Sequence, residues 1–555
     1  MFKPNKTYVF ALGGLGEVGK NMYCLLQDDE IIIIDAGVLF PDSELRGIDY
    51  VLPDFSFLKK NESKIRTLII THGHEDHIGA IPFLLQEVKI PSIYAPNQAA
   101  YLIRKKLEER NNNYKFLYVY DEKTKLKYKH FQVEFFRTTH SVPDSFGVSV
   151  TSPNGTVVET GDFKFDLTPI GPPPDLYKMA SIGNSGATLL LSDSTNALDE
   201  GFSASESKVD AALGDIFLKH QENRIIIATF ASNIYRLKHI IETCKKNNRK
   251  VCLMGRSMEN NVQISIESGY IKNDNTIISP EVLNTLKPSE VAILCTGTQG
   301  EPLAALSRIA DGSHRSINLI PNNDVVIFSS SAIPGNAAYI ANTINNLYLK
   351  GVKVYTTSSA GEIHTSGHGK EEELKLMLRL INPKYFMPIH GDYRMLKRHA
   401  DIAKECGIEN TFVLDNGDVL CIDNNEIYPA GKIEINDIFV DGNRIGDVSS
   451  AVMHDRKVMA SDGILLVIAN IDMQNKKLLI SPNITTRGFV QINENEELIK
   501  KIEKLANKVI NNNLKDKKIT FNDIKTELTK NLSNFIMSET GRKPIILSLL
   551  LDIKR

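Results

Sequence analysis

One short segment of the sequence gathers several side chains that can bind a metal ion. The motif THGHEDH, residues 71–77, contains His72, His74, Asp76 and His77 directly after an apolar run at residues 65–70. Imidazole nitrogens combined with carboxylate oxygens suit zinc. In a loop after a strand, alternate residues converge on one point while their neighbours serve a second. The spacing H-x-H-x-D-H therefore predicts two metal ions close together, and a solvated polar loop is the structural alternative.

Three later segments offer further ligands, each in a loop that follows an expected strand. They place His140 in THSVPDS, Asp162 in TGDFKFD and His390 in PIHGDYRM. Any one of them alone is typical of an ordinary loop residue. Seven of the 13 histidines, however, fall in these loop motifs: His72, His74, His77, His140, His364, His368 and His390. This clustering favours a metal site assembled from distant loops.

Other loops offer groups that suit phosphate binding or turns. Small residues at 329–335 and 366–367 supply hydroxyls and backbone N–H groups where a phosphate can dock, and we expect Ser331, His364 and Ser366 to contribute. Asp193, taken alone, is more typical of a turn-capping aspartate. The glycines of GLGEVG, residues 14–19, match a dinucleotide-binding pattern, but the required helix is not expected after them. We therefore assign them to a turn between strands.

The predicted strands and helices that must position these loops follow different patterns in different parts of the chain. Residues 1–205 contain short β-branched runs separated by turns, with a few helical patterns between them. The segment SASE, residues 203–206, predicts a capping box that opens a helix. From there to residue 356, strands and helices alternate strictly, which indicates a parallel sheet covered by helices.

A third pattern of predicted strands and helices begins near residue 450. Strands at 463–471 and 476–481 precede helices at 494–511 and 521–537 and an apolar end strand. This order predicts a small α+β domain with its own core. The stretch 423–447 is rich in Asn, Asp and Gly and is the expected linker.

Composition restricts the class of protein. The chain has 555 residues, a net charge of −2 and no apolar run near the roughly 20 residues that span a bilayer. The first thirty residues lack the pattern of a secretory signal. Six scattered cysteines without a CxxC pair argue against a disulfide framework and fit a reducing cytoplasm. A nucleic-acid partner would have to be held by a local basic groove, because the net charge gives no long-range attraction.

Taken together, the motifs resemble a known family. HGHEDH, THSVPDS and TGDFKFD are similar to successive metal motifs of the metallo-β-lactamase superfamily, and DSTNA, IHTSGHGKEEE and PIHGDYRM are similar to its nucleic-acid-processing β-CASP branch. From GGLGEVGKNMY to TGRKPIILSLLL, the whole chain resembles the bacterial ribonuclease J family. The resemblance implies an αββα sandwich with an inserted α/β β-CASP domain and a small α+β C-terminal domain. The implied domains are 1–205 and 351–435 (metallo-β-lactamase core), 206–350 (insertion), 436–450 (linker) and 451–555 (association domain).

The resemblance also implies roles for individual residues. One Zn²⁺ would be held by His72, His74 and His140. A second would be held by Asp76, His77 and His390, with Asp162 bridging the two ions. Mn²⁺ can replace zinc at such sites. Asp35 would support the loops and orient the imidazoles.

Catalytic roles follow from the same resemblance. Asp193 and His368 would form a proton-donating pair for the leaving oxygen, and Asp76 counts as catalytic as well as a ligand. A histidine oriented by a carboxylate is a credible general acid. Ala337 stands where an acidic residue is expected in relatives, and its effect on recognition of the RNA end stays open.

The implied function is a metal-dependent ribonuclease with 5′→3′ exonuclease and endonuclease activity on single-stranded RNA, preferably 5′-monophosphorylated. It would act in mRNA decay and rRNA maturation in the cytoplasm, as a homodimer or homotetramer, with a paralogue as a further partner. One alternative is a catalytically weak RNA-binding paralogue, although no ligand is missing here. Another is a small-molecule hydrolase such as a lactonase or thioesterase, which would not need the insertion. Turnover of 5′-monophosphorylated RNA, with and without a chelator, separates the three.

Overall fold

The structure is a computed structural model of the chain. It describes residues 2–41, 45, 47–283, 285–299, 304–330, 336–442, 444–446, 450–491, 495–516 and 518–553. The chain divides into two compact units. One consists of Met1–Leu39 with Leu52–Asp437, and the other of Phe40–Val51 with Ile438–Arg555.

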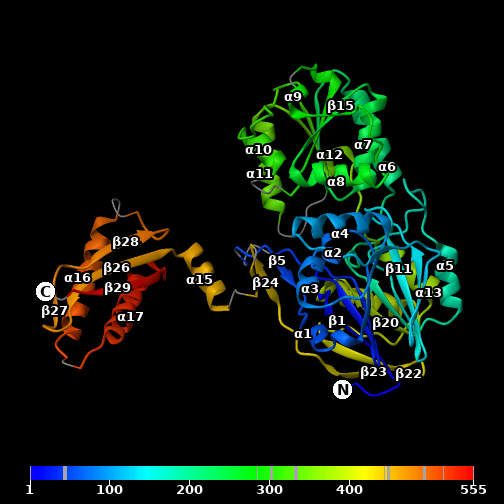
Figure 1. The fold of residues 1–555 in the computed structure, drawn as a ribbon. Helices are drawn as coiled ribbons and strands as arrows, with labels where there is room; N and C mark the ends of the chain where they lie inside the picture. Colours follow the sequence, from blue (N-terminus) through cyan, green and yellow to red (C-terminus); the bar gives the residue numbers. More distant parts are fainter. Residues whose placement is uncertain are drawn as a thin grey trace. The chain divides into compact units, whose positions relative to one another are not determined.

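Two sheets packed face to face form the body of the first unit (Figure 1). The larger has strand order β23-β22-β1-β3-β4-β6-β7-β8, and the smaller has order β20-β13-β12-β11-β10-β9. Val9 and Ile32 of the larger sheet meet Phe135 and Leu189 of the smaller in one core. The strands are β1 (Thr7–Gly13), β3 (Met22–Gln27), β4 (Glu30–Ile34), β6 (Ile65–Ile69), β7 (Ile93–Ala95), β8 (Leu117–Val119), β9 (Lys125–Lys127), β10 (Gln132–Arg137), β11 (Phe146–Ser152), β12 (Gly155–Glu159), β13 (Leu189–Asp193), β20 (Tyr385–Ile389), β22 (Asp418–Asp423) and β23 (Glu426–Lys432).

Helices cover the outer faces of this pair of sheets. Side chains of α5, α13 and α14 pack on the outer face of the smaller sheet, where Met179 and Met377 contact a core that includes Phe386. Helix α4 lies against β7 and β8 of the larger sheet. The helices are α1 (Ser56–Lys60), α2 (Glu75–Ile78), α3 (Ile81–Glu87), α4 (Asn97–Glu109), α5 (Leu176–Asn184), α13 (Glu371–Ile381) and α14 (Tyr393–Glu405), with a 3-10 turn at Glu62–Lys64. The predicted αββα sandwich is confirmed.

The insertion forms a third sheet, drawn in green in Figure 1. All of its strands are parallel, in the order β16-β15-β17-β14-β18-β19, and apolar cores line both of its faces. Near-continuous apolar runs such as Ile225–Thr229 follow from burial on both faces. The predicted covered parallel sheet is thus confirmed. Its elements are α6 (Glu206–Lys219), β14 (Ile225–Thr229), α7 (Ile234–Lys246), β15 (Lys250–Met254), α8 (Arg256–Glu267), β16 (Ile277–Ile278), α9 (Pro280–Leu283), a 3-10 turn (Pro288–Glu290), β17 (Val291–Cys295), α10 (Ala305–Asp311), β18 (Val325–Ser329), α11 (Ala337–Leu349), β19 (Lys353–Tyr355) and α12 (Thr357–Ala360).

Two local predictions can be compared with the structure. The capping box at Ser203 is wrong: α6 begins at Glu206, and the side chain of Ser205 caps it. The Ser203 hydroxyl and backbone N–H instead donate to the buried carboxylate of Glu373, at 2.8 and 2.6 Å. The glycine-rich segment 14–19 leads through the short strand β2 (Leu15–Gly16) into β3, with no helix, as predicted.

The stretch 423–447, predicted as a linker, contains strands that the prediction lacked. Its first part is β23, which pairs with β22 at the edge of the larger sheet. Further along are β24 (Ile438–Asp441) and β25 (Arg444–Ile445), which form a small sheet with β5 (Tyr50–Leu52). Turn residues in this stretch therefore mark tight connections between strands rather than a structureless linker.

The second unit contains the predicted α+β arrangement. Strand β26 pairs with β28 on one side and in parallel with β29 on the other. Helices α16 and α17 pack their apolar stripes on one face of this sheet, around Leu465, Val467 and Leu528. The elements are α15 (Ser450–Ser461), β26 (Ile464–Asp472), β27 (Lys477–Leu478), β28 (Asn483–Arg487), α16 (Glu496–Asn513), α17 (Phe521–Thr540) and β29 (Ile545–Asp552).

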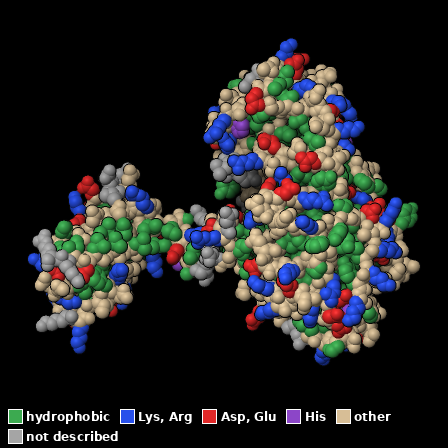
Figure 2. Space-filling view, in the orientation of Figure 1, with side chains coloured by type: hydrophobic (Ala, Val, Ile, Leu, Met, Phe, Trp, Pro, Cys, Tyr) green, Lys and Arg blue, Asp and Glu red, His purple; other side chains and the backbone are tan. Residues whose placement is uncertain are grey.

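The other face of that sheet carries apolar side chains. The register pairs Leu466 with Leu547 and Ile468 with Leu549, on the face away from the helices. Leu547 and Leu549 are 50% and 46% exposed, and Figure 2 shows hydrophobic side chains gathered on this unit. Among the described helices of the whole chain, none is both long and apolar enough to cross a bilayer.

Candidate metal centre

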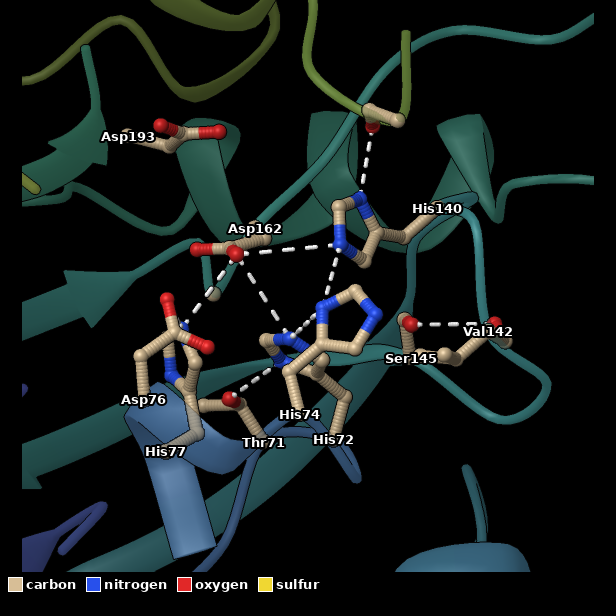
Figure 3. A network of polar contacts seen from close by, with 12 residues as sticks. Thr71, His72, His74, Asp76, His77, His140, Val142, Ser145, Asp162 and Asp193 are labelled. Carbon is tan, nitrogen blue, oxygen red and sulfur yellow. Dashed lines mark hydrogen bonds and ion pairs between the residues drawn. The ribbon is translucent and has the colours of Figure 1, made fainter. Parts of the chain in front are cut away.

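Seven side chains predicted as metal ligands come together where strands of the two packed sheets end. The loop after β6 supplies His72 and His74, the short helix α2 that follows supplies Asp76 and His77, and the loops after β10, β12 and β20 supply one each. Figure 3 shows the imidazoles of the first loop and of His140 gathered around the carboxylate of Asp162. The ligand atoms form two groups, and within each group all of the atoms lie within 4.8 Å of one another. The groups are His72, His74, His140 and Asp162, and Asp76, His77, Asp162 and His390.

Asp162 lies between the two groups. Its Oδ2 is 3.5 Å from His72 Nε2, 3.2 Å from His77 Nε2 and 3.7 Å from His140 Nε2. Its Oδ1 is 3.4 Å from His390 Nε2. His390 Nε2 is also 3.1 Å from Asp76 Oδ2. One buried carboxylate thus faces ligand atoms from both groups, which is the placement expected of a bridging ligand.

The donor atoms fit divalent cations. Among the described residues, buried Oδ1 of Asp162 has no hydrogen-bond partner, although buried carboxylate oxygens are normally satisfied. Nδ1 of His74 lies 3.2 Å from His72 Nε2 and 3.1 Å from His140 Nε2. These three nitrogens face one another. If each imidazole is neutral and carries its proton on the opposite ring nitrogen, only lone pairs point at this centre. A cation satisfies all of these atoms together.

A buried carboxylate fixes two of the imidazoles from behind. Nδ1 of His77 donates to Oδ2 of Asp35 at 2.7 Å. The Thr71 hydroxyl donates to the same oxygen at 2.8 Å and accepts from Nδ1 of His72 at 3.0 Å. Both imidazoles therefore carry their proton on Nδ1 and turn Nε2 toward Asp162. Asp35 thus contacts His77 directly and His72 through Thr71.

Gly367 supports His140 from the opposite side. Its carbonyl accepts from Nδ1 of His140 at 2.6 Å. A Cβ at this position would lie only 2.6 Å from His140 Cε1 and 2.8 Å from Nδ1. The loop approaches the imidazole this closely because glycine has no side chain.

Asp193 and His368 form a pair beside the metal ligands. Nδ1 of His368 donates to Oδ2 of Asp193 at 2.7 Å. The other oxygen, Oδ1, accepts from the backbone N–H and the hydroxyl of Thr195, so the turn-capping role is present as well. Burial alone would lower the pKa of His368, but the Asp193 carboxylate raises it above the usual value. His368 also lies beside His140, with ring centroids 4.9 Å apart.

The two ligand groups differ in electrostatics. Burial lowers the pKa of His72 and His140 far below the usual value and that of His74 to about 4, so these imidazoles are neutral near pH 7. Burial acts in the same direction on His390, but the carboxylate of Asp162 outweighs it and raises the pKa to about 9. The imidazoles of the group around His72, His74 and His140 are therefore neutral. In the group around Asp76, His77 and His390, the imidazoles are paired with carboxylates.

The residues predicted to bind phosphate are only partly described. Ser331 lies outside the described residues. Nδ1 of His364 is 2.7 Å from a nitrogen of the buried Arg236 guanidinium, which can only donate. The Ser366 hydroxyl accepts from Asn196 Nδ2 at 2.8 Å and from the backbone N–H of His368 at 3.1 Å. The Ser366 oxygen therefore accepts twice and still has its own proton to donate.

The supporting roles of several residues in this centre escaped the sequence interpretation. Thr71 and Thr195 support imidazoles through their hydroxyls, Gly367 through its carbonyl and Arg236 through its guanidinium. Asn21 Nδ2 lies 3.1 Å from His77 Nε2. The only available signal was proximity in sequence to a ligand motif, as for Thr71 and Gly367.

Family models match four parts of the chain. Residues 15–211 match the metallo-beta-lactamase superfamily, and residues 222–347 match the ribonuclease J beta-CASP domain. Residues 361–413 match the Zn-dependent metallo-hydrolase RNA specificity domain, and residues 451–553 match the ribonuclease J C-terminal domain.

Known proteins resemble the chain over its full length. Ribonuclease J 1 of Streptococcus pyogenes is 47% identical over 99% of this chain and 98% of its own. Ribonuclease J2 of Bacillus subtilis is 38% identical over 98% of both chains. A protein of unknown function from Enterococcus faecalis, 14% identical, shares the fold over 75% of this chain and 100% of its own, with a TM-score of 0.55. The chain therefore belongs to the ribonuclease J family, whose members are metal-dependent hydrolytic ribonucleases.

Proposed function

We propose that this ribonuclease removes nucleotides from the 5′ end of single-stranded RNA that carries a 5′-monophosphate, and that it also cuts within such RNA. The cellular roles would be mRNA decay and rRNA maturation in the cytoplasm. Its cofactor would be two Zn²⁺ ions, with Mn²⁺ as the alternative. The observation that carries the proposal is the convergence of two ligand groups on the buried, incompletely satisfied carboxylate of Asp162.

The ligand roles follow from the two groups. His72, His74 and His140 would hold one ion. Asp76, His77 and His390 would hold the other, with Asp162 shared. When bound, the ions would supply the charge that activates a water molecule and stabilises the attacking and leaving oxygens.

The remaining residues position atoms and move a proton. Asp35 keeps the imidazoles of His72 and His77 in the tautomer that turns Nε2 toward the centre. His368 is 20% exposed at its side chain, and Asp193 fixes its Nδ1–H. Nε2 is thereby the ring nitrogen left to give a proton to the departing 3′-oxygen.

Recognition of a 5′-monophosphate rests on Ser366 and its neighbours. The Ser366 hydroxyl accepts two hydrogen bonds, so its own proton is available to a phosphate oxygen. It lies two residues from His368, which would place a bound 5′ end beside the cleavage site. His364 and Ser331 would complete this pocket.

The first experiment compares RNA substrates and metal states. Short single-stranded RNA with a 3′ fluorophore and a 5′-monophosphate, 5′-hydroxyl or 5′-triphosphate is incubated with the protein before and after EDTA treatment, and bound metal is quantified by mass spectrometry. We expect shortening from the 5′ end, fastest on 5′-monophosphorylated RNA, abolished by EDTA and restored by Zn²⁺ or Mn²⁺. RNA binding without cleavage by the metal-loaded protein would support the RNA-binding paralogue instead. Hydrolysis of a lactone alone would support the small-molecule hydrolase.

A second experiment tests the phosphate pocket alone. Ser366→Ala removes the one proton that we assign to the phosphate, so the preference for 5′-monophosphate over 5′-hydroxyl RNA should fall about 10-fold, as for a lost hydrogen bond to a charged group. Ser181→Ala, on an exposed face of α5, is the matched control. An unchanged preference in Ser366→Ala would exclude this residue from 5′-end recognition.

We further propose that the protein works as a homodimer or homotetramer, with a paralogue as an additional partner. Domains would be divided as the sequence predicts, at 1–205, 206–350, 351–435 and 451–555, with β19 (Lys353–Tyr355) extending the sheet of the insertion beyond residue 350. The apolar face of β26 and β29 supports self-association through the C-terminal domain, because large exposed apolar patches typically mark interfaces. Light scattering on the purified protein measures the number of subunits.

A further inference from the structure

The metal centre contains two arrangements built to the same plan. In each, one buried aspartate accepts a hydrogen bond from Nδ1–H of one histidine. The same aspartate also accepts from a threonine hydroxyl, whose oxygen lies against Nδ1 of a second histidine. The first arrangement is Asp35 with His77 directly and His72 through Thr71. The second contains the proposed proton-donating pair of Asp193 and His368 and adds Thr195 and His390 to it. It lies around Asp193.

In the second arrangement Asp193 contacts His368 directly and His390 through Thr195. Nδ1 of His368 is 2.7 Å from Oδ2 of Asp193. The Thr195 hydroxyl donates to Oδ1 at 2.7 Å and lies 3.2 Å from Nδ1 of His390. The backbone N–H of Thr195 also donates to Oδ1, at 2.9 Å, just as that of Thr71 donates to Asp35 at 2.8 Å. Both threonines are thus held to their aspartate at two points.

The direction of these hydrogen bonds fixes the tautomer of His390. A hydroxyl has one proton, and the short contact with a carboxylate is the strongest use of it. The Thr195 oxygen can then only accept from Nδ1 of His390, so Nδ1 carries a proton. The lone pair of the neutral ring is therefore on Nε2, which faces Asp76 at 3.1 Å and Asp162 at 3.4 Å.

His390 needs such a support more than the other ligands. Its backbone has φ 52°, in the left-handed region that non-glycine residues rarely adopt. It directly follows β20 and lies far in sequence from the ligands at residues 72–77. The Thr195 hydroxyl lies 3.3 Å from the His390 carbonyl as well as near its ring, so one side chain contacts both its backbone and its imidazole.

From this geometry we infer that Thr195 is a positioning residue, which sets the tautomer and orientation of His390 and ties that ligand to the Asp193–His368 pair. The inference rests on the proposed role of His390 as a ligand. It extends that role, because ion binding by His390 and proton donation by His368 then depend on the same carboxylate.

The test compares two substitutions at Thr195 in the full-length protein. Thr195→Val keeps the shape but removes the hydroxyl, whereas Thr195→Ser keeps the hydroxyl. Metal retention is measured directly, by mass spectrometry of Zn²⁺ left after equilibration with a chelator of known affinity, and does not depend on activity. We expect Val to weaken retention of one of the two ions by about 10- to 100-fold, the usual loss when a partner of a ligand is removed, and Ser to stay within about threefold of wild type. Thr343→Val is the matched control, because Thr343 is also buried and its hydroxyl donates to the carbonyl of Tyr339 in its own helix, α11.

Kinetics and a double variant complete the test. Thr195→Val should lower kcat on 5′-monophosphorylated RNA more than it raises KM, and thermal unfolding of the apo-proteins verifies that the variants fold. In His390→Ala, the added Thr195→Val should cause no further loss of metal, because the contact acts through His390. Three results would overturn the inference. Thr195→Val could retain Zn²⁺ as wild type does, Thr195→Ser could lose as much Zn²⁺ as Thr195→Val, or the losses of Zn²⁺ in the double variant could be additive. Unchanged retention in His390→Ala would instead overturn the proposed ligand set.

Discussion

Replacing Gly367 by alanine adds a single methyl group where the loop contacts a proposed metal ligand. The new Cβ would lie 2.6 Å from Cε1 and 2.8 Å from Nδ1 of His140, and 3.0 Å from Cβ of Ser141. Carbon atoms in ordinary contact are about 3.5–4.0 Å apart, so the loop or the imidazole must move by about 1 Å. The φ angle of Gly367 lies outside the left-handed region, so the backbone itself accepts alanine and only the contact matters.

The expected loss follows from that displacement. Moving the loop breaks the 2.6 Å hydrogen bond from Nδ1 of His140 to the Gly367 carbonyl, and moving the ring shifts Nε2 away from Asp162. A misplacement of 1 Å in an active site costs about 100-fold, which corresponds to about 2.7 kcal/mol in kcat/KM. Retention of the ion beside His140 should fall by about 10- to 100-fold.

The assay combines kcat/KM on 5′-monophosphorylated RNA with the metal content after chelator competition. Gly214→Ala is the matched control, because a Cβ on that residue of α6 would meet nothing within 4 Å. Alanine there should leave both readouts unchanged and favour the helix by up to about 1 kcal/mol. If Gly367→Ala keeps its metal and stays within threefold of wild-type kcat/KM, the close approach of this loop to His140 is not what positions that ligand.

Four further predictions address separate features. Asp162→Asn removes the shared charge while keeping the shape, so metal content should fall and kcat/KM should drop by more than about 100-fold; a metal-loaded, active variant would rule out the bridging role. Tyr270→Phe removes the phenol that donates to Asp144, and amides at 141–145 should exchange faster with deuterium than in wild type, whereas equal rates would show that the contact does not hold this loop. Leu549→Glu should reduce the molar mass in light scattering by disrupting the apolar sheet face, and an unchanged mass would place the interface elsewhere. Burial and the neighbouring guanidinium lower the pKa of His364 to about 3, so its NMR ring signals should not titrate between pH 5 and 8, and a midpoint in that range would contradict the buried contact.

The convergence of the candidate ligands was predictable because their signal lies in short stretches of sequence. His72 and His77 sit in one compact motif, and His140, Asp162 and His390 each follow a recognisable strand. The alternation of strands and helices likewise predicted the covered parallel sheet of the insertion, because burial on both faces demands long apolar runs.

The supporting residues were not predictable, because their roles depend on partners far away in the chain. Thr195 is a common turn residue until the fold brings His390 against its hydroxyl. Ser203 looked like a helix cap because the pattern is local, but the carboxylate of Glu373, 170 residues later, competes for its donors. The buried position of Arg236 could not be predicted, because it depends on partners such as His364 and Glu206 that are distant in sequence.

The order of the ligands along the chain has a consequence for synthesis. Asp162 and the residues after β6 are synthesised early, but His390 directly follows β20, which comes after the whole insertion. Roughly 230 residues separate Asp162 from His390, so translation at about 5–20 residues per second delays the last ligand by some 11 to 46 seconds. Under the proposed ligand set, the metal centre of a nascent chain is therefore incomplete until His390 has been synthesised.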